Sequence, residues 1–303
     1  MTSSEADAPD KKIQTKQLTK REALIKKFIH RICTPVQSEQ RISAIDAFFN
    51  SCDKIEFDDK EAQFIWKGLF YSIWYTEMGK GCEQVMSSIV RGASKQRNIL
   101  LTGFSTLSTE WGGIDYIRLD KFAHFARLLL QSLLQFVFER DEARVDLVKQ
   151  TLDKIKRAKG LYYHLLDIYT CELLKCINNS ALQHQKEKSR MLQKFTTIFL
   201  KDMVESDDSR TLNIIRLSVF RDLPERLQEE EDLYTLNRYL VQMTRLFSKL
   251  AKCNSLNSKR RAFFKNISNN FKGNKPSDEQ LSSVPQKRRR APSSMSKKRV
   301  KSQ

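Results

Sequence analysis

The residues of this sequence best suited to acid–base chemistry are three carboxylates close together in one segment, Glu110, Asp115 and Asp120. Glycosidase-like hydrolysis needs two carboxyl groups that converge on one cleft with divergent pKa values. Helical spacing separates these three side chains, so their pattern favours a helix cap and solvated helix charges. The segment therefore indicates a helix junction and no active site.

Nucleophilic and metal chemistry find little support elsewhere. His124 and His164 fall in predicted helices, without a Ser or Cys nucleophile tied to either by spacing. The cysteines show neither a CxxC pair nor a zinc-finger spacing with histidine, so we expect reduced thiols that mostly fill the core. The motifs GxGxxG, GxxxxGK[ST] and HExxH are absent. We expect a protein that is not an enzyme and has no metal, cofactor or small-molecule ligand.

Positive charge is concentrated at the C-terminal end of the sequence. The 303 residues include 54 Lys and Arg against 36 Asp and Glu, a net charge of +18, and residues 254–303 hold 14 of the former and 2 of the latter. Two basic clusters in this tail are spaced like a bipartite nuclear-import signal, and flexible cations of this kind also bind RNA phosphates. The clusters are Lys287, Arg288, Arg289 and Arg290, then Lys297, Lys298, Arg299 and Lys301. A merely solvated charged tail is the alternative.

The elements that must position these residues are helices. Apolar residues recur at spacings of three and four, and only 9 Gly and 6 Pro punctuate the chain. Short-looped helical pairs predict an all-α fold, an irregular helical-repeat array of HEAT-like α-solenoid character. The polar first residues and the lack of a long apolar run lead us to expect neither a secretory signal nor a membrane span.

Composition suggests three regions along the chain. We expect disorder over residues 1–12, an α-helical scaffold domain over 13–253, and a basic, mostly disordered tail over 254–303 that carries the import signal. A short basic helix is expected near the start of the tail, and one long helix over about 224–253 ends the scaffold.

One predicted helix, over residues 58–77, is apolar around most of its circumference and should therefore be central. For Trp66 and Trp74, core packing is favoured over stacking on bases. Gly68, in the interior of this helix, indicates that another backbone or a large ring lies against it.

The segment TEWGGIDYIRLDKF, residues 109–122, predicts a junction between two helices. Gly112 and Gly113 would end the first helix, and Asp115 would cap the second. On that second helix, Arg118 and Lys121 are candidates to contact phosphate or the acidic face of a partner, as is Arg127 on its polar face. The alternative is an intrahelical pair such as Asp115 with Arg118.

Three stretches of the sequence resemble the ribosomal RNA processing protein 1 family, an all-helical nucleolar family. They are FIWKGLFYSIWYTEM (64–78), TEWGGIDYIRLDKFAHFARLLLQ (109–131) and GLYYHLLDIYTCEL (160–173). The residues that carry the resemblance include Trp66, Gly68, Trp74, Trp111, Asp115, Asp120, His164 and Asp167.

The resemblance implies a non-catalytic assembly factor of the nucleolar precursor of the large ribosomal subunit, required for processing of the large-subunit rRNA precursor. It implies a nuclear and nucleolar scaffold whose partners are large-subunit pre-rRNA, other assembly factors and ribosomal proteins. A helical adaptor of another nuclear complex, acting in chromatin or transport, is the alternative.

Overall fold

Helix α3 (Asp59–Tyr75) shows how local sequence starts a helix and tertiary packing completes it. The helix begins at a capping box: the backbone N–H of Glu61 donates to Asp58 Oδ1 at 2.8 Å, and that of Asp58 donates to Glu61 Oε2 at 3.0 Å. Trp66 is 1% exposed, and its indole Nε1 donates to the carbonyl oxygen of Ile99. Because α3 packs on α1, α4 and α5, it is the central helix that its sequence predicts.

The structure is a computed structural model that describes residues 9–34, 37–140, 145–180, 184–230 and 232–277. All regular elements in these ranges are helical. Those up to residue 140 are α1 (Pro9–Cys33), α2 (Ser38–Ser51), α3, α4 (Lys80–Ala93), α5 (Arg97–Glu110), the 3-10 turn η1 (Trp111–Gly113) and α6 (Tyr116–Arg140). Those that follow are α7 (Val145–Ile155), α8 (Lys159–Asn179), α9 (Gln185–Thr197), α10 (Leu200–Glu205), α11 (Ser209–Ile215), the π-helical turn η3 (Arg216–Arg221), α12 (Asp222–Glu229), α13 (Leu233–Ala251) and α14 (Ser258–Gly273).

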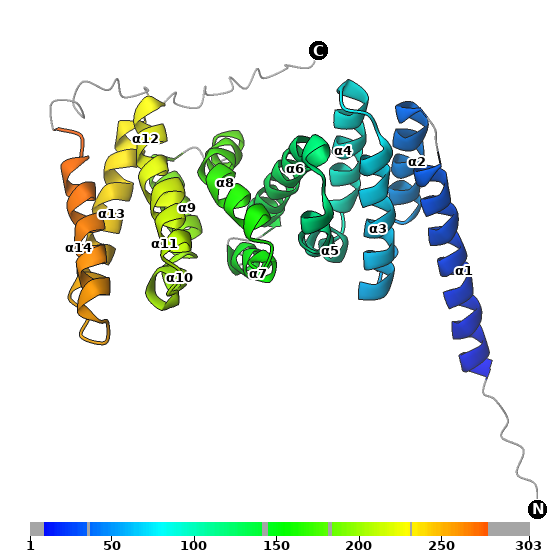
Figure 1. Ribbon diagram of the computed structural model, residues 1–303, viewed down its shortest axis with the longest axis horizontal. Helices are drawn as coiled ribbons and strands as arrows, with labels where there is room; N and C mark the ends of the chain where they lie inside the picture. Colours follow the sequence, from blue (N-terminus) through cyan, green and yellow to red (C-terminus); the bar gives the residue numbers. More distant parts are fainter. Residues whose placement is uncertain (1–8, 35–36, 141–144, 181–183, 231, 278–303) are drawn as a thin grey trace, which may run out of the picture.

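The helices stack in two rows over the first two thirds of the molecule. Helices α1, α3, α5 and α7 pack in succession in one row, and α2, α4, α6 and α8 form the other. Beyond α8, the array continues through α9, α13 and α14, so that α1 and α14 lie at opposite ends of an elongated molecule (Figure 1). The predicted all-α helical array is confirmed.

A single hydrophobic core runs along the array. Its buried side chains form one cluster that extends from Ile25 on α1 to Phe271 on α14. Close approaches inside it need glycine: a Cβ on Gly103 would lie 2.5 Å from the Trp66 ring. A Cβ on Gly68 would lie 2.7 Å from the Ile29 side chain, so the neighbour there is neither a backbone nor a ring as expected.

The helices differ from expectation towards both ends of the chain. The long helix expected over 224–253 is two helices, because Asp232 starts α13 by accepting a hydrogen bond from the Thr235 N–H at 3.2 Å. Helix α1 already begins at Pro9, within the region expected to be disordered. The basic helix expected in the tail is α14, and it buries Phe264 and other apolar residues against the array. The helical scaffold therefore continues past the expected boundary at residue 253.

Candidate functional site

Lys121 fastens the start of α6 to the end of α3. Its side chain is 3% exposed, and its ammonium donates to the carbonyl oxygens of Ile73 (2.9 Å), Trp74 (3.0 Å) and Thr76 (2.9 Å). The last carbonyls of a helix have no partner within the helix, and a cation is favoured at that end of the helix dipole. Burial lowers the pKa of Lys121. The expectation that Lys121 contacts phosphate or a partner is therefore wrong, because its ammonium is buried and caps α3.

A second buried cation, Arg41 of α2, meets the same helix end. Arg41 is 3% exposed, and its guanidinium donates to Thr76 Oγ1 at 2.5 Å and to the carbonyl oxygen of Ser72 at 3.3 Å. Burial lowers its pKa. Reasoning from sequence missed Arg41, because nothing in its local pattern distinguishes it from a surface arginine.

Asp115 caps α6 as predicted. The backbone N–H of Arg118 donates to Asp115 Oδ1 at 3.0 Å, and the Arg118 guanidinium forms an ion pair with Oδ2. Desolvation raises the pKa of Asp115, but the hydrogen bonds from Arg118 outweigh it and leave that pKa lowered. The guanidinium also lies 4.7 Å from the centre of the Trp74 ring. This is the intrahelical pair considered as the alternative; because Arg118 is half-buried, its contact with a partner stays a prediction.

The two glycines before the cap differ from expectation. Gly112 and Gly113 form the turn η1, and neither has the positive φ of a left-handed helix end. Trp111, the first residue of this turn, packs on α8, where a Cβ on Gly160 would lie 2.8 Å from Trp111 Nε1. The tryptophan, more than the glycines, therefore sets the position of the junction.

Arg127 belongs to a buried ionic cluster between α6 and α8. The carboxylate of Glu172, which is fully buried, accepts hydrogen bonds from Arg127 (2.7 Å), Gln131 (2.5 Å) and Lys175 (3.1 Å). Burial raises the pKa of Glu172, but these partners outweigh it, and the net shift is downward. Arg127 is partly exposed, so a partner contact there stays a prediction. Asp120 is exposed.

Apolar side chains are exposed where α3 ends and α6 begins. Tyr116 is 85% exposed, Ile117 67%, Met78 61% and Tyr75 58%. We call these four residues the junction edge. Lys121 and Arg118 hold the two helix ends against each other, so the junction edge has a rigid base. Exposed apolar side chains on two helix ends that pack together make this junction a candidate protein interaction surface.

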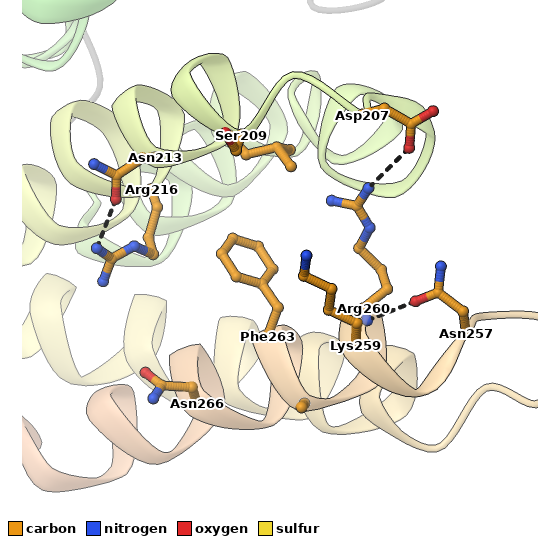
Figure 2. A pocket seen from close by; sticks show the side chains of 11 residues that line it. Asp207, Ser209, Asn213, Arg216, Asn257, Lys259, Arg260, Phe263 and Asn266 are labelled. Atoms are coloured by element: carbon orange, nitrogen blue, oxygen red, sulfur yellow. Dashed lines mark hydrogen bonds and ion pairs between the residues drawn. The ribbon is translucent and has the colours of Figure 1, made fainter.

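A basic cleft that the sequence did not indicate lies between α11 and α14. Its volume is about 600 Å³, and Figure 2 shows side chains of both elements facing each other across it. The residues used below, which we call the α11–α14 cleft, are Asp207, Asn213, Arg216, Lys259, Phe263 and Asn266. In the sequence, only the basic composition of α14 could have indicated one side of this cleft.

The tail residues Lys287, Arg288, Arg289, Arg290, Lys297, Lys298, Arg299 and Lys301 lie outside the described residues. Within the described ranges, no group of three or more His, Cys, Asp or Glu is placed to hold a metal ion. In the same ranges, no helix has the length and apolar character needed to cross a membrane.

Comparison with known proteins identifies relatives of the chain. The family model described as nucleolar protein, Nop52, matches residues 35–301. The human ribosomal RNA processing protein 1 homolog B is 28% identical over 197 residues, which are 58% of this chain and 25% of that protein. The mouse ribosomal RNA processing protein 1 homolog A is 29% identical over 185 residues, which are 56% of this chain and 36% of that protein. The Drosophila melanogaster homolog is 25% identical over 167 residues, which are 50% of this chain and 24% of that protein.

The chain thus spans well under half the length of these relatives. The family match nevertheless covers most of the chain, including the junction, the cleft and the basic tail. Its description also agrees with the nucleolar localisation expected from the sequence. The chain therefore belongs to the Nop52 family of nucleolar proteins and is related to ribosomal RNA processing protein 1, as its sequence motifs indicate.

Proposed function

We propose that this chain is a non-catalytic assembly factor of the nucleolar precursor of the large ribosomal subunit. It is required for processing of the large-subunit rRNA precursor, and it acts as a helical scaffold that binds other assembly factors and pre-rRNA. The observation that carries the proposal is the family match over residues 35–301, together with relatives that are named for ribosomal RNA processing. Cleavage of the RNA is left to other proteins.

The way the buried carboxylates are used supports a structural role for them. Glu172 is paired with Arg127 and Lys175, and the mostly buried Asp202 is paired with Lys149 and Lys156. An acid or base catalyst must reach a substrate, whereas these carboxylates tie helices together. Such pairing is what a rigid scaffold needs.

The junction edge is the surface proposed for protein partners. Tyr and Met side chains are enriched at protein interfaces, and here they lie at or just beyond helix ends that buried cations hold in place. A preorganised surface loses little conformational freedom on binding. The basic tail, Lys287–Arg290 and Lys297–Lys301, is proposed to serve nuclear import and to contact pre-rRNA.

The test is sedimentation of a cell extract that contains the tagged full chain, followed by purification and identification of the bound RNA and proteins. We expect large-subunit pre-rRNA and other assembly factors to be recovered. Recovery of a chromatin or transport complex, or of free protein alone, would contradict the proposal.

Variants of the same tagged chain test the junction edge. The double change Tyr116→Ser with Ile117→Ser should reduce recovery of protein partners while thermal stability is kept, because both side chains are exposed. Tyr234→Ser, which removes an exposed ring from α13, is the matched control and should leave recovery unchanged. Equal recovery with both variants would show that partners bind elsewhere.

A further inference from the structure

We infer that the α11–α14 cleft is a binding site for a single-stranded RNA segment, with phosphates on Arg216 and Lys259 and a base stacked on Phe263. The inference rests on the proposed function in that it names a place where the scaffold would contact pre-rRNA. It assigns that contact to the folded array and not to the tail.

Charge is the first support for an anionic ligand. Helix α14 carries Lys259, Arg260, Arg261, Lys265 and Lys272, and the sequence has no Asp or Glu between residues 254 and 277. Lys259 is exposed, and among the described residues its ammonium has no carboxylate partner. Across the cleft, the Arg216 guanidinium makes one hydrogen bond within the described part of the chain, to Asn213 Oδ1 at 2.8 Å, which leaves its other donors free for phosphate.

Arg260 has a different role, because it closes one end of the cleft. Its guanidinium donates to the carbonyl oxygen of Ser206 at 2.6 Å and lies 4.0 Å from Asp207, and its side chain is mostly buried. Arg260 therefore sets the distance between α14 and the loop before α11, and Arg216 and Lys259 remain as the two cations available to a ligand (Figure 2).

Phe263 supplies an aromatic face inside this charged cleft. The ring stands between the two helices in Figure 2 and is only partly buried. From behind, it is supported by an edge contact with the buried Phe264, with ring centres 5.6 Å apart. An anchored ring beside cations is the combination with which proteins hold unpaired bases.

The Phe263 ring beside two cations favours RNA over an acidic protein. A carboxylate can pair with Arg216 or Lys259 but has no flat face to stack on the ring, whereas a nucleotide offers both a phosphate and a base. Base edges and ribose hydroxyls can also form hydrogen bonds with the Asn213 and Asn266 amides, since both partners carry donors and acceptors. A concave cavity of about 600 Å³ also suits a splayed nucleotide better than the shallow groove of an RNA duplex.

The test measures binding of the purified full chain to a fluorescently labelled 12-nucleotide single-stranded RNA by anisotropy. Arg216→Glu with Lys259→Glu should weaken binding about 10-fold or more, as expected when both phosphate contacts are reversed. The matched control, Lys265→Glu with Lys272→Glu, makes the same charge change on exposed residues of α14 outside the cleft. It should weaken binding only about 2-fold to 3-fold, through the general field. Equal losses in the two variants would overturn the inference.

Phe263→Leu is a second test variant, which changes no charge and keeps the apolar contact with Phe264. It should weaken single-stranded RNA binding about 5-fold to 10-fold, since stacking is lost, and leave duplex RNA binding unchanged. Thermal unfolding of each variant checks that it is folded. Unchanged RNA affinity of this variant would mean that no base stacks on Phe263. If the variant instead lost binding to poly-glutamate while RNA affinity stayed the same, the ligand would be an acidic protein.

The sedimentation experiment separates this inference from the proposed function. If cleft variants bind RNA normally and the chain sediments with large-subunit precursors, RNA binding in the cleft is refuted and the proposed function is supported. If the chain is absent from those precursors but its RNA affinity depends on the cleft, the proposed function is refuted and RNA binding in the cleft is supported.

Discussion

At the residue scale, the chain uses its buried charges to join helices. Lys121 and Arg41 both meet the end of α3 at Thr76, and Glu172 gathers three donors from α6 and α8. Each of these groups is costly to bury unless its hydrogen bonds are satisfied. Removing one partner should therefore cost more than an exposed ion pair contributes.

Lys121→Met keeps the length and apolar stem of the side chain but removes the donor to three carbonyl oxygens. We expect the free energy of unfolding to fall by about 2–3 kcal/mol, the range for buried hydrogen bonds to a charged group. Urea denaturation followed by circular dichroism measures it. Lys67→Met, on the exposed side of α3, is the control, and a comparable loss in both variants would mean that the three bonds contribute nothing.

Glu172→Gln should reveal a stability term that depends on pH. The folded state lowers the pKa of Glu172, so the unfolded chain binds the proton more readily, and the carboxylate stabilises the fold above the usual glutamate pKa of about 4.3. That contribution is lost as pH falls through the lowered, folded-state pKa. The wild type should exceed the variant by about 1–3 kcal/mol at pH 7, with a smaller gap near pH 3. Urea unfolding at the two pH values measures the gap, and a gap that widens on acidification would contradict the assignment.

At the element scale, glycine sets how closely helices approach. Gly103 of α5 lies under the Trp66 ring of α3, and Gly160 of α8 lies under Trp111 at the junction. Each contact lets a large, rigid ring pack between two helices of the array. The tryptophans of the family motif therefore act together with glycines distant in sequence.

Gly103→Ala should destabilise the protein although alanine is the better helix former. The new Cβ would lie 2.5 Å from a ring atom of Trp66, which is buried and has no room to shift. Overpacking of this kind costs about 1–3 kcal/mol, and the gain in helix propensity offsets part of it. Gly113→Ala is the control, because nothing lies within 4 Å of its Cβ position. Thermal unfolding should show a lower Tm for the first variant only.

At the scale of the whole molecule, the array ends with α14 and not with α13. Helix α14 buries Phe264, Ile267 and Phe271, and the Phe247 ring of α13 packs between Phe264 and Phe271. Cutting the chain after residue 253 would expose this apolar surface to water. We propose that residues up to 277 form one scaffold and that the residues beyond serve as a separate basic segment.

Two truncations test this division. A chain of residues 1–277 should unfold at the same temperature as the full chain, whereas residues 1–253 should show a Tm lower by about 4 °C or more. As a fluorescent fusion, the 1–277 chain should also fail to accumulate in the nucleus, because the import clusters are gone. Nuclear accumulation of that fusion would place the import signal in the folded array.

Much of this fold was predictable because its signals are local. The apolar period of α3, the cap at Asp115 and the basic helix after residue 254 each depend on residues within a few turns of one another. The break between α12 and α13 was missed because Gln228, Glu229 and Glu230 favour a helix, although no apolar residue lies between Leu227 and Leu233. Asp232 starts the new helix by accepting a hydrogen bond from a backbone N–H of α13. The expectation that Gly112 and Gly113 would end the first helix through special glycine conformations also differed from the structure. A tight 3-10 turn joins the two helices without a left-handed residue.

The sequence by itself determined that the chain is helical, that it is strongly basic at one end and that its motifs are those of a nucleolar family, since composition, spacing and motif order all lie along the chain. Only the tertiary structure decided that Lys121 and Arg41 face inward and that Arg216 faces Lys259 and Phe263 across a cleft. Burial depends on neighbours that are tens of residues away, as Lys121 and Ile73 are. A lysine on a helix has the same local sequence pattern whether it caps another helix or binds RNA. Only its packing in the tertiary structure distinguishes the two roles.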